Sequence, residues 1–228
     1  MSRRALVLTP DLVARTKRLV ADPGRDPNLQ YFSDAEYDAI VADMLAGRAP
    51  NSPLWLFACG SLIWKPEVDH VEERMGRAHG WHRSFCFRIT RFRGTPDVPG
   101  LMMAMDRGGQ CRGVLFRLSD HAPEEALGKL FRREFIAKPP NNLPRWIEVE
   151  PEGGPPVQAI AFVMNRQSPA YLGRLEHEIV ADYLAAACGH AGSGAEYLYN
   201  TVHHLAARGI YDRNLMRLQA LVAEKIGG

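Results

Sequence analysis

The sequence predicts an α+β domain in which a mixed, curved sheet or small barrel is flanked by helices. Apolar, strand-like runs concentrate between residues 54 and 164, and helical patterns dominate after residue 170. A single helical pattern, at residues 123–135, lies among the strands. Because strands and helices do not alternate regularly, neither a Rossmann fold nor a TIM barrel is expected.

The first 50 residues are predicted to form a helical N-terminal extension, and the main domain is placed at residues 51–228. Leu12-Val13 and Leu19-Val20 recur seven residues apart, as on one face of a helix. Farther along, Ser33-Asp34-Ala35-Glu36 is a capping-box sequence, in which the Ser and Glu side chains satisfy free N–H groups at a helix start. We therefore expect two helical pieces in this extension.

Six runs of apolar or alternating residues are predicted to be strands. The run from Leu54 to Cys59 is wholly apolar, as in a buried strand, and Gly60-Ser61 ends it. Gly108-Gly109 separates two later runs and predicts a turn between two strands. In chain order, the predicted strands are residues 54–59, 81–90, 101–105, 113–118, 146–149 and 157–164.

Four segments carry helical signals in the main domain. The first follows Asp120, a residue typical of helix starts, and Gly189 and Gly209 close the next two, as glycine commonly does at helix ends. The predicted helices are residues 123–135, 175–188, 195–207 and 212–226.

Composition and charge exclude several classes of function. Lysine and arginine number 28 and acidic residues 26, so a net charge of +2 gives no general electrostatic reason to bind nucleic acid or an anionic membrane. No segment has the length of a membrane span, and the N-terminal apolar run is too short for a signal peptide. The four cysteines form no C-x-x-C pair and the eight histidines have no metal-ligand spacing. We expect a cytoplasmic protein with free thiols and no metal.

The predicted helix at residues 123–135 carries a carboxylate on its apolar side. Leu127, Leu130 and Phe131 lie at positions i, i+3 and i+4, and the i+7 position is Glu134. A carboxylate that faces a core must be paired, neutralised or directed into a cavity. Glu134 is therefore either the partner of an arginine such as Arg132 or Arg133, or a desolvated general base.

Two loops have weaker signals. Gly60-Ser61 directly after a buried strand exposes consecutive backbone N–H groups, which can bind an anion; alternatively, it is a plain turn. The segment 83–93 interleaves arginine and phenylalanine, which can imitate a platform for single-stranded nucleic acid. A solvated strand face suits the low net charge better, although one arginine here can still hold a substrate carboxylate.

The segment Phe57–Pro66 resembles the ChaC family of γ-glutamylcyclotransferases, which carry a Tyr-Gly-Ser-Leu turn after the first strand. Other segments resemble later signatures of the family in the same order, from about Leu54 to the C-terminus. These segments are Arg93–Gly100, Arg133-Glu134, Pro169–Gly173, Glu196–Thr201 and Gly209–Asp212.

The resemblance implies a γ-glutamylcyclotransferase-like fold and a carbon–nitrogen lyase without cofactor or metal. Its ChaC branch acts on a small molecule, glutathione, giving 5-oxoproline and cysteinylglycine. The family's catalytic glutamate falls at Glu134, as general acid and base. The substrate-binding residues that the resemblance implies are Cys59, Gly60, Ser61, Leu62, Arg93 and Tyr197.

One position departs from the family pattern, because Cys59 stands where the family has tyrosine. Either the backbone does the binding and a small residue is tolerated, or activity is redirected to other γ-glutamyl amines or peptides. A non-catalytic regulator that binds γ-glutamyl ligands is a further alternative. Two other hypotheses use the thiol itself, as a redox-active thiolate or as the nucleophile of a cysteine hydrolase or amidase.

Overall fold

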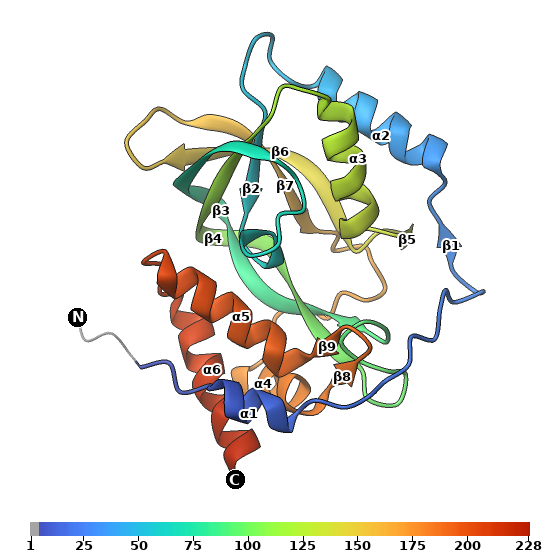
Figure 1. Ribbon diagram of the computed structural model, residues 1–228, viewed down its shortest axis with the longest axis vertical. Coiled ribbons are helices and arrows are strands. Elements are labelled where there is room, and N and C mark those ends of the chain that lie inside the picture. Colours follow the sequence, from blue (N-terminus) through green and yellow to red (C-terminus); the bar gives the residue numbers. More distant parts are fainter. Residues whose placement is uncertain (1–4) are drawn as a thin grey trace. The chain divides into compact units, whose positions relative to one another are not determined.

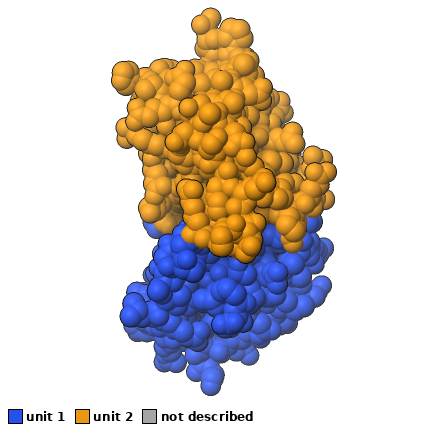
Figure 2. Space-filling view, turned by 90° about the vertical axis from the view of Figure 1, so that its right-hand side faces the viewer, with its two compact units in different colours: residues 1–24, 84–103, 170–228 blue, residues 25–83, 104–169 orange. Residues whose placement is uncertain are grey.

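A computed structural model describes residues 5–228 of the chain. The chain divides into two compact units, which Figure 2 colours separately. Unit 1 contains residues 1–24, 84–103 and 170–228, and unit 2 contains residues 25–83 and 104–169. The sequence-based division at residue 50 stays a prediction.

Unit 2 is built on a closed barrel of mixed strands, with the neighbour order β2–β4–β3–β6–β7 (Figure 1). β2 pairs antiparallel with β4 and parallel with β7. The predicted α+β class with a small mixed barrel is confirmed. The strands are β2 (Trp55–Ala58), β3 (His70–Ile89), β4 (Gly100–Leu118), β6 (Asn142–Pro151) and β7 (Val157–Met164). The last residues of β3 and the first of β4 belong to unit 1.

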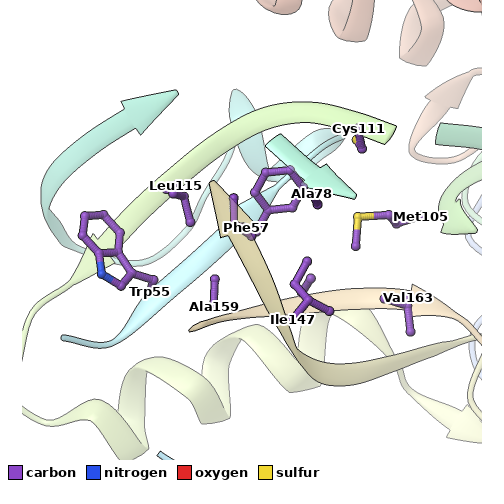
Figure 3. Packing of buried hydrophobic residues seen from close by; sticks show 11 residues of the cluster. Trp55, Phe57, Ala78, Met105, Cys111, Leu115, Ile147, Ala159 and Val163 are labelled. Atoms are coloured by element: carbon purple, nitrogen blue, oxygen red, sulfur yellow. The ribbon is translucent and has the colours of Figure 1, made fainter. Parts of the chain in front are cut away.

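The barrel interior holds an apolar cluster drawn from all five strands. Figure 3 shows the side chains of Phe57, Leu115 and Ile147 directed toward one another. Each is at most 6% exposed, and alternate residues along each strand supply the cluster, as the pleat requires. Cys59 packs against this cluster, so the residue after β2 lies at the barrel's edge.

Two helices pack against each other in unit 2, α2 (Asp34–Ala46) and α3 (Pro123–Glu134) (Figure 1). α2 starts with the predicted capping box, since Ser33 accepts from Glu36 N and the Glu36 carboxylate accepts from Ser33 N. Tyr37 on α2 donates to Phe135 O at 2.8 Å, just after α3. A two-stranded ladder of β1 (Gln30–Tyr31) and β5 (Ala137–Lys138) adjoins these helices in sequence.

Unit 1 is mainly helical. The predicted C-terminal helices are present with small changes at their ends, and α6 begins after Asp212, whose carboxylate accepts from Asn214 N and Leu215 N. A two-stranded ladder separates α4 from α5. The elements are α1 (Pro10–Arg15), α4 (His177–Ala186), β8 (Cys188–Gly189), β9 (Gly192–Ser193), α5 (Gly194–Ala207) and α6 (Arg213–Gly227).

The turn predicted at Gly108-Gly109 is wrong. β4 runs without interruption from Gly100 to Leu118, and both glycines lie inside it with positive φ, 107° and 69°. The His82 ring of β3 lies 3.0 Å from Gly108 O, so β4 continues alongside β3 at this point. Glycines with positive φ here accommodate a local irregularity of the strand, as in a β-bulge, rather than a reversal of the chain.

The predicted helical face in the N-terminal segment is only half present. α1 ends at Arg15, and the Thr16 hydroxyl donates to Val13 O and shares a hydrogen bond with the Ser193 hydroxyl, both at 2.7 Å. Val13 is buried, whereas Leu19 is fully exposed. The prediction of helix at Leu19-Val20 is wrong because Thr16 bonds to the backbone behind it and caps the helix.

Residues 5–228 contain neither a helix long and apolar enough to cross a membrane nor a cluster of three or more side chains suited to hold a metal ion. The four cysteines are free thiols. All are buried except Cys59, which is partly exposed.

Candidate active site

The turn after β2 forms the first part of the candidate site. Gly60 O accepts from Ile63 N at 2.9 Å, and Ser61 O accepts from Trp64 N at 3.2 Å, which closes a 3₁₀ helix, η1 (Ser61–Ile63). The N–H groups of Gly60, Ser61 and Leu62 take no part in these bonds, as at the start of any helix. The turn therefore presents the consecutive donors that the sequence predicts, and their role in binding stays a prediction.

Arg83, on β3, anchors the chain immediately before this turn. Its side chain is buried, its Nε donates to Cys59 O at 2.6 Å, and its Nη2 donates to Arg112 O on β4. A buried guanidinium is costly unless its N–H groups are bonded. Cys59 O and Gly60 N belong to the same planar peptide group. Arg83 therefore also fixes the direction of the first N–H of the turn.

We expect Arg83→Met to lower the free energy of unfolding by about 3 kcal/mol, because it leaves two acceptor carbonyls of the barrel without this donor. Urea denaturation followed by circular dichroism measures this loss. The matched control is Arg77→Met, which removes an exposed arginine of the same strand that donates to Gln110 at 3.1 Å. Its expected loss is within about 0.5 kcal/mol. Equal losses in the two variants would remove the anchoring role.

Glu134, the last residue of α3, lies where the apolar side of that helix ends. Leu127, Leu130 and Phe131 are each at most 1% exposed and form the predicted stripe. Glu134 continues the stripe, and its side chain is 15% exposed. The carboxylate is thus largely removed from water while a small part of its surface stays accessible.

Glu134 is paired only loosely. Arg133 Nε lies 3.4 Å from Glu134 Oε1, beyond the about 3.2 Å limit of an ordinary N–H···O bond. Arg132, the other arginine considered as a partner, binds Asp34 at 2.7 Å instead. Burial raises the pKa of Glu134 from its ordinary 4.5 to about 7; Arg133 opposes this rise, and the charge of Glu67 adds to it. Near neutral pH the carboxyl can therefore both accept and release a proton.

Arg133 connects α3 with the turn. Its guanidinium donates to Ser61 Oγ at 3.2 Å and to Lys65 O, just beyond η1. The charge of Glu134 also raises the pKa of Cys59, which places the two groups within electrostatic reach of each other. The structure thus brings the predicted catalytic residue and the predicted turn together within unit 2.

Cys59 has the properties of a neutral thiol. Its pKa is raised well above the ordinary range, first by a hydrogen bond with the Cys111 thiol and then by burial. Cys111 lies inside the barrel on β4 and is labelled in Figure 3. A nucleophilic or redox-active cysteine works as a thiolate, which needs a lowered pKa. The environment of Cys59 therefore weighs against both hypotheses that use its sulfur.

Arg93 and Tyr197 lie together in unit 1. Arg93 Nη1 donates to Glu196 Oε2 and to Ser193 O, both at 2.9 Å, and its guanidinium carbon lies 5.5 Å from the centre of the Tyr197 ring. Tyr197 is buried, and its ring meets Phe85 edge-on. The two residues are neighbours, and their role as substrate contacts stays a prediction.

Three residues of this environment were missed as site residues in the sequence: Glu67, Arg83 and Cys111. Arg83 stands close to the aromatic residues Trp81, Phe85 and Phe87, and a charge in such surroundings is a signal of a buried, bonded cation. Glu67 and Cys111 give no such signal, because their importance comes from contacts that only the folded chain creates.

The chain matches the ChaC-like protein family over residues 54–225. It is 37% identical over 184 residues to the glutathione-specific γ-glutamylcyclotransferase of Escherichia coli (strain K12), covering 81% of this chain and 79% of that protein. It is 31% identical to glutathione-specific γ-glutamylcyclotransferase 1 of Homo sapiens, covering 64% and 66% of the two chains.

Solved structures agree on the fold. The crystal structure of a yeast γ-glutamyl cyclotransferase specific to glutathione superimposes with a TM-score of 0.68 at 20% identity, covering 76% of this chain and 97% of that one. The family match spans the barrel, α3 with Glu134 and the C-terminal helices. The chain therefore belongs to the ChaC-like protein family.

Proposed function

We propose that this protein is a glutathione-specific γ-glutamylcyclotransferase that converts glutathione into 5-oxoproline and cysteinylglycine. The names of the relatives from Escherichia coli and Homo sapiens support this substrate. The observation that carries the proposal for the chemistry is Glu134, a largely buried carboxyl with a pKa of about 7, whose neighbour Arg133 binds the turn after β2.

The reaction is an intramolecular aminolysis. The α-amine of the γ-glutamyl group attacks its own γ-carbonyl carbon, so that a carbon–nitrogen bond closes a five-membered ring. The amide bond to cysteinylglycine then breaks, and the leaving nitrogen takes up a proton. Because the nucleophile belongs to the substrate, no catalytic serine or cysteine is needed, and we propose that no cofactor or metal takes part.

Glu134 supplies the proton transfers. The amine is protonated at neutral pH and the departing nitrogen is a poor leaving group, so one proton must be removed and one delivered. A carboxyl with a pKa of about 7 suits both steps, because it is present in both protonation states near neutral pH. One residue therefore acts first as the base and then as the acid.

The substrate-binding groups are proposed on separate grounds. The N–H groups of Gly60, Ser61 and Leu62 would hold the oxyanion or a carboxylate of the substrate, next to the Cys59 peptide that Arg83 anchors. In unit 1, Arg93 and Tyr197 are proposed as further contacts, and Arg93 already binds the carboxylate of Glu196. Holding the γ-glutamyl chain folded brings amine and carbonyl together, which supplies proximity.

We also propose that the protein works in the cytoplasm on this small molecule, without nucleic acid or membrane as a partner. The free thiols support a reducing compartment, in which glutathione is abundant.

The proposal is tested by incubating the protein with glutathione at millimolar concentration and measuring 5-oxoproline and cysteinylglycine by mass spectrometry. Parallel reactions contain γ-glutamyl dipeptides that lack the cysteinylglycine part. Formation of both products from glutathione alone is the expected result. Comparable 5-oxoproline from the dipeptides would favour the broader γ-glutamyl specificity, and no product from any of them would favour a ligand-binding regulator.

A further inference from the structure

Glu67 lies four residues after the end of η1, in an unusual backbone conformation. Its φ is +57°, in the left-handed region that residues other than glycine seldom adopt. Two cations hold its carboxylate, Lys65 Nζ at 2.9 Å and Arg133 Nη1 at 3.3 Å. Residues held in this region are often functional, because the surroundings must enforce a conformation that costs free energy.

Arg133 faces two carboxylates at once. Its Nη1 is 3.3 Å from Glu67 Oε2, and its Nε is 3.4 Å from Glu134 Oε1. Its closer bonds go to Ser61 Oγ and Lys65 O. Because the Arg133 guanidinium already binds the turn and Glu67, fewer of its N–H groups remain for the bidentate pair that arginine otherwise forms with a carboxylate, here Glu134.

We propose that Glu67 is a positioning residue for the reaction: it shares the Arg133 guanidinium with Glu134 and so prevents Glu134 from becoming a fully paired carboxylate. The proposal rests on the proposed role of Glu134 as acid and base. A carboxylate locked in a bidentate ion pair gives up its capacity to accept a proton, whereas a loosely paired one keeps it. Glu67 thereby preserves the capacity that the chemistry uses.

The charges around Glu134 agree with this role. Arg133 from α3 lowers the pKa of Glu134, and Glu67 from the segment after η1 raises it. The Cys59 thiol, just after β2, is a further titratable group that interacts electrostatically with Glu134. Glu67 itself stays ionised at neutral pH, because its bond with Lys65 and the charge of Arg133 lower its pKa.

The substitution Glu67→Gln tests the proposal, because it removes the charge and keeps the size of the side chain. Both consequences favour the ionised form of Glu134: a neighbouring negative charge disappears, and Arg133 becomes free to pair with Glu134. We expect the pKa of Glu134 to fall by about 0.5 unit. NMR titration of ¹³C-labelled glutamate carboxyls measures this shift without any need for turnover, and the Glu134 signal is assigned by its loss in Glu134→Gln.

Two further variants separate sharing of Arg133 from a general charge effect. Asp69→Asn removes a carboxylate of the same segment, which forms no ion pair with Arg133 in the described part of the chain, and it should leave the Glu134 titration unchanged. Glu67→Asp keeps the charge, so the pKa of Glu134 should fall less in this variant than in Glu67→Gln. An unchanged Glu134 titration in Glu67→Gln, or an equal shift in Asp69→Asn, overturns the proposal.

The kinetic profile connects the same variants with catalysis. In the wild type, kcat/KM for glutathione should fall as the pH drops through about 7. In Glu67→Gln, the pH at which this fall occurs should be lower by as much as the pKa of Glu134 measured by NMR is lowered. A shift seen by NMR without turnover in any variant would leave the role of Glu67 toward Glu134 in place and reject the proposed function. If the pKa of Glu134 measured by NMR falls in Glu67→Gln but the pH dependence of kcat/KM does not change, Glu67 does not act on the reaction.

Discussion

Replacing Glu134 with glutamine should lower kcat for the cyclisation of glutathione by about 10²- to 10⁴-fold, the range that a general acid–base group contributes. The amide has the same shape but neither accepts a proton from the substrate ammonium nor delivers one to the leaving nitrogen. KM should change far less, because the proposed binding donors are backbone N–H groups of the turn at Gly60–Leu62.

Steady-state kinetics with 5-oxoproline as the measured product checks this expectation. Glu125→Gln is the matched control, since Glu125 lies on the same helix but is exposed and bound to Lys129 at 2.8 Å. Its kcat should stay within twofold of the wild type. Retained turnover in Glu134→Gln, with a wild-type circular dichroism spectrum, would remove Glu134 from the mechanism.

The elements that the sequence predicted well are those whose signals are local. The start of α2 at Ser33 depends on two side chains three residues apart, and β7 coincides with the apolar run Val157–Met164. Gly108-Gly109 misled for the opposite reason. Positive φ permits either a hairpin or a bend within a strand, and the choice between them is made by the long pairing of β4 with β3. That pairing is a property of the barrel rather than of the two glycines.

The same distinction applies to the site. Glu134 could be found from the sequence because a charge on an apolar helical stripe is a local contradiction. The contacts of Glu67 and Arg83 could not be assigned in this way. The first matters through a guanidinium 66 positions later in the chain, and the second through one carbonyl just after β2 and another on β4. A residue such as Glu67, which is proposed to act on Glu134 through Arg133, belongs to no periodic pattern or motif spacing by which the sequence could reveal it.

Glu134→Gln should also make the protein more stable at alkaline pH, by about 3 kcal/mol relative to the wild type. The pKa of Glu134 is about 7 in the folded chain and about 4.5 when unfolded, so the folded chain binds the proton more tightly. The wild type therefore loses stability as the pH rises from 4.5 to 7, and each pKa unit is worth about 1.4 kcal/mol. Glutamine has no such loss.

Urea denaturation of both proteins at pH 5 and pH 8 measures this difference, most of which should develop between the two values. Glu125→Gln again serves as the control: Lys129 lowers the pKa of Glu125 from its ordinary 4.5, so this carboxylate is ionised from pH 5 to pH 8 and its replacement should add almost no pH dependence in that interval. If the difference in unfolding free energy between the wild type and Glu134→Gln is the same at pH 8 as at pH 5, Glu134 ionises in the folded protein without penalty. The carboxyl would then be an ordinary solvated acid, and the desolvation that suits it to proton transfer would be absent. If Glu134→Gln both loses activity and becomes more stable, the ionised form of Glu134 lowers the stability of the folded protein while its carboxyl is needed for the reaction.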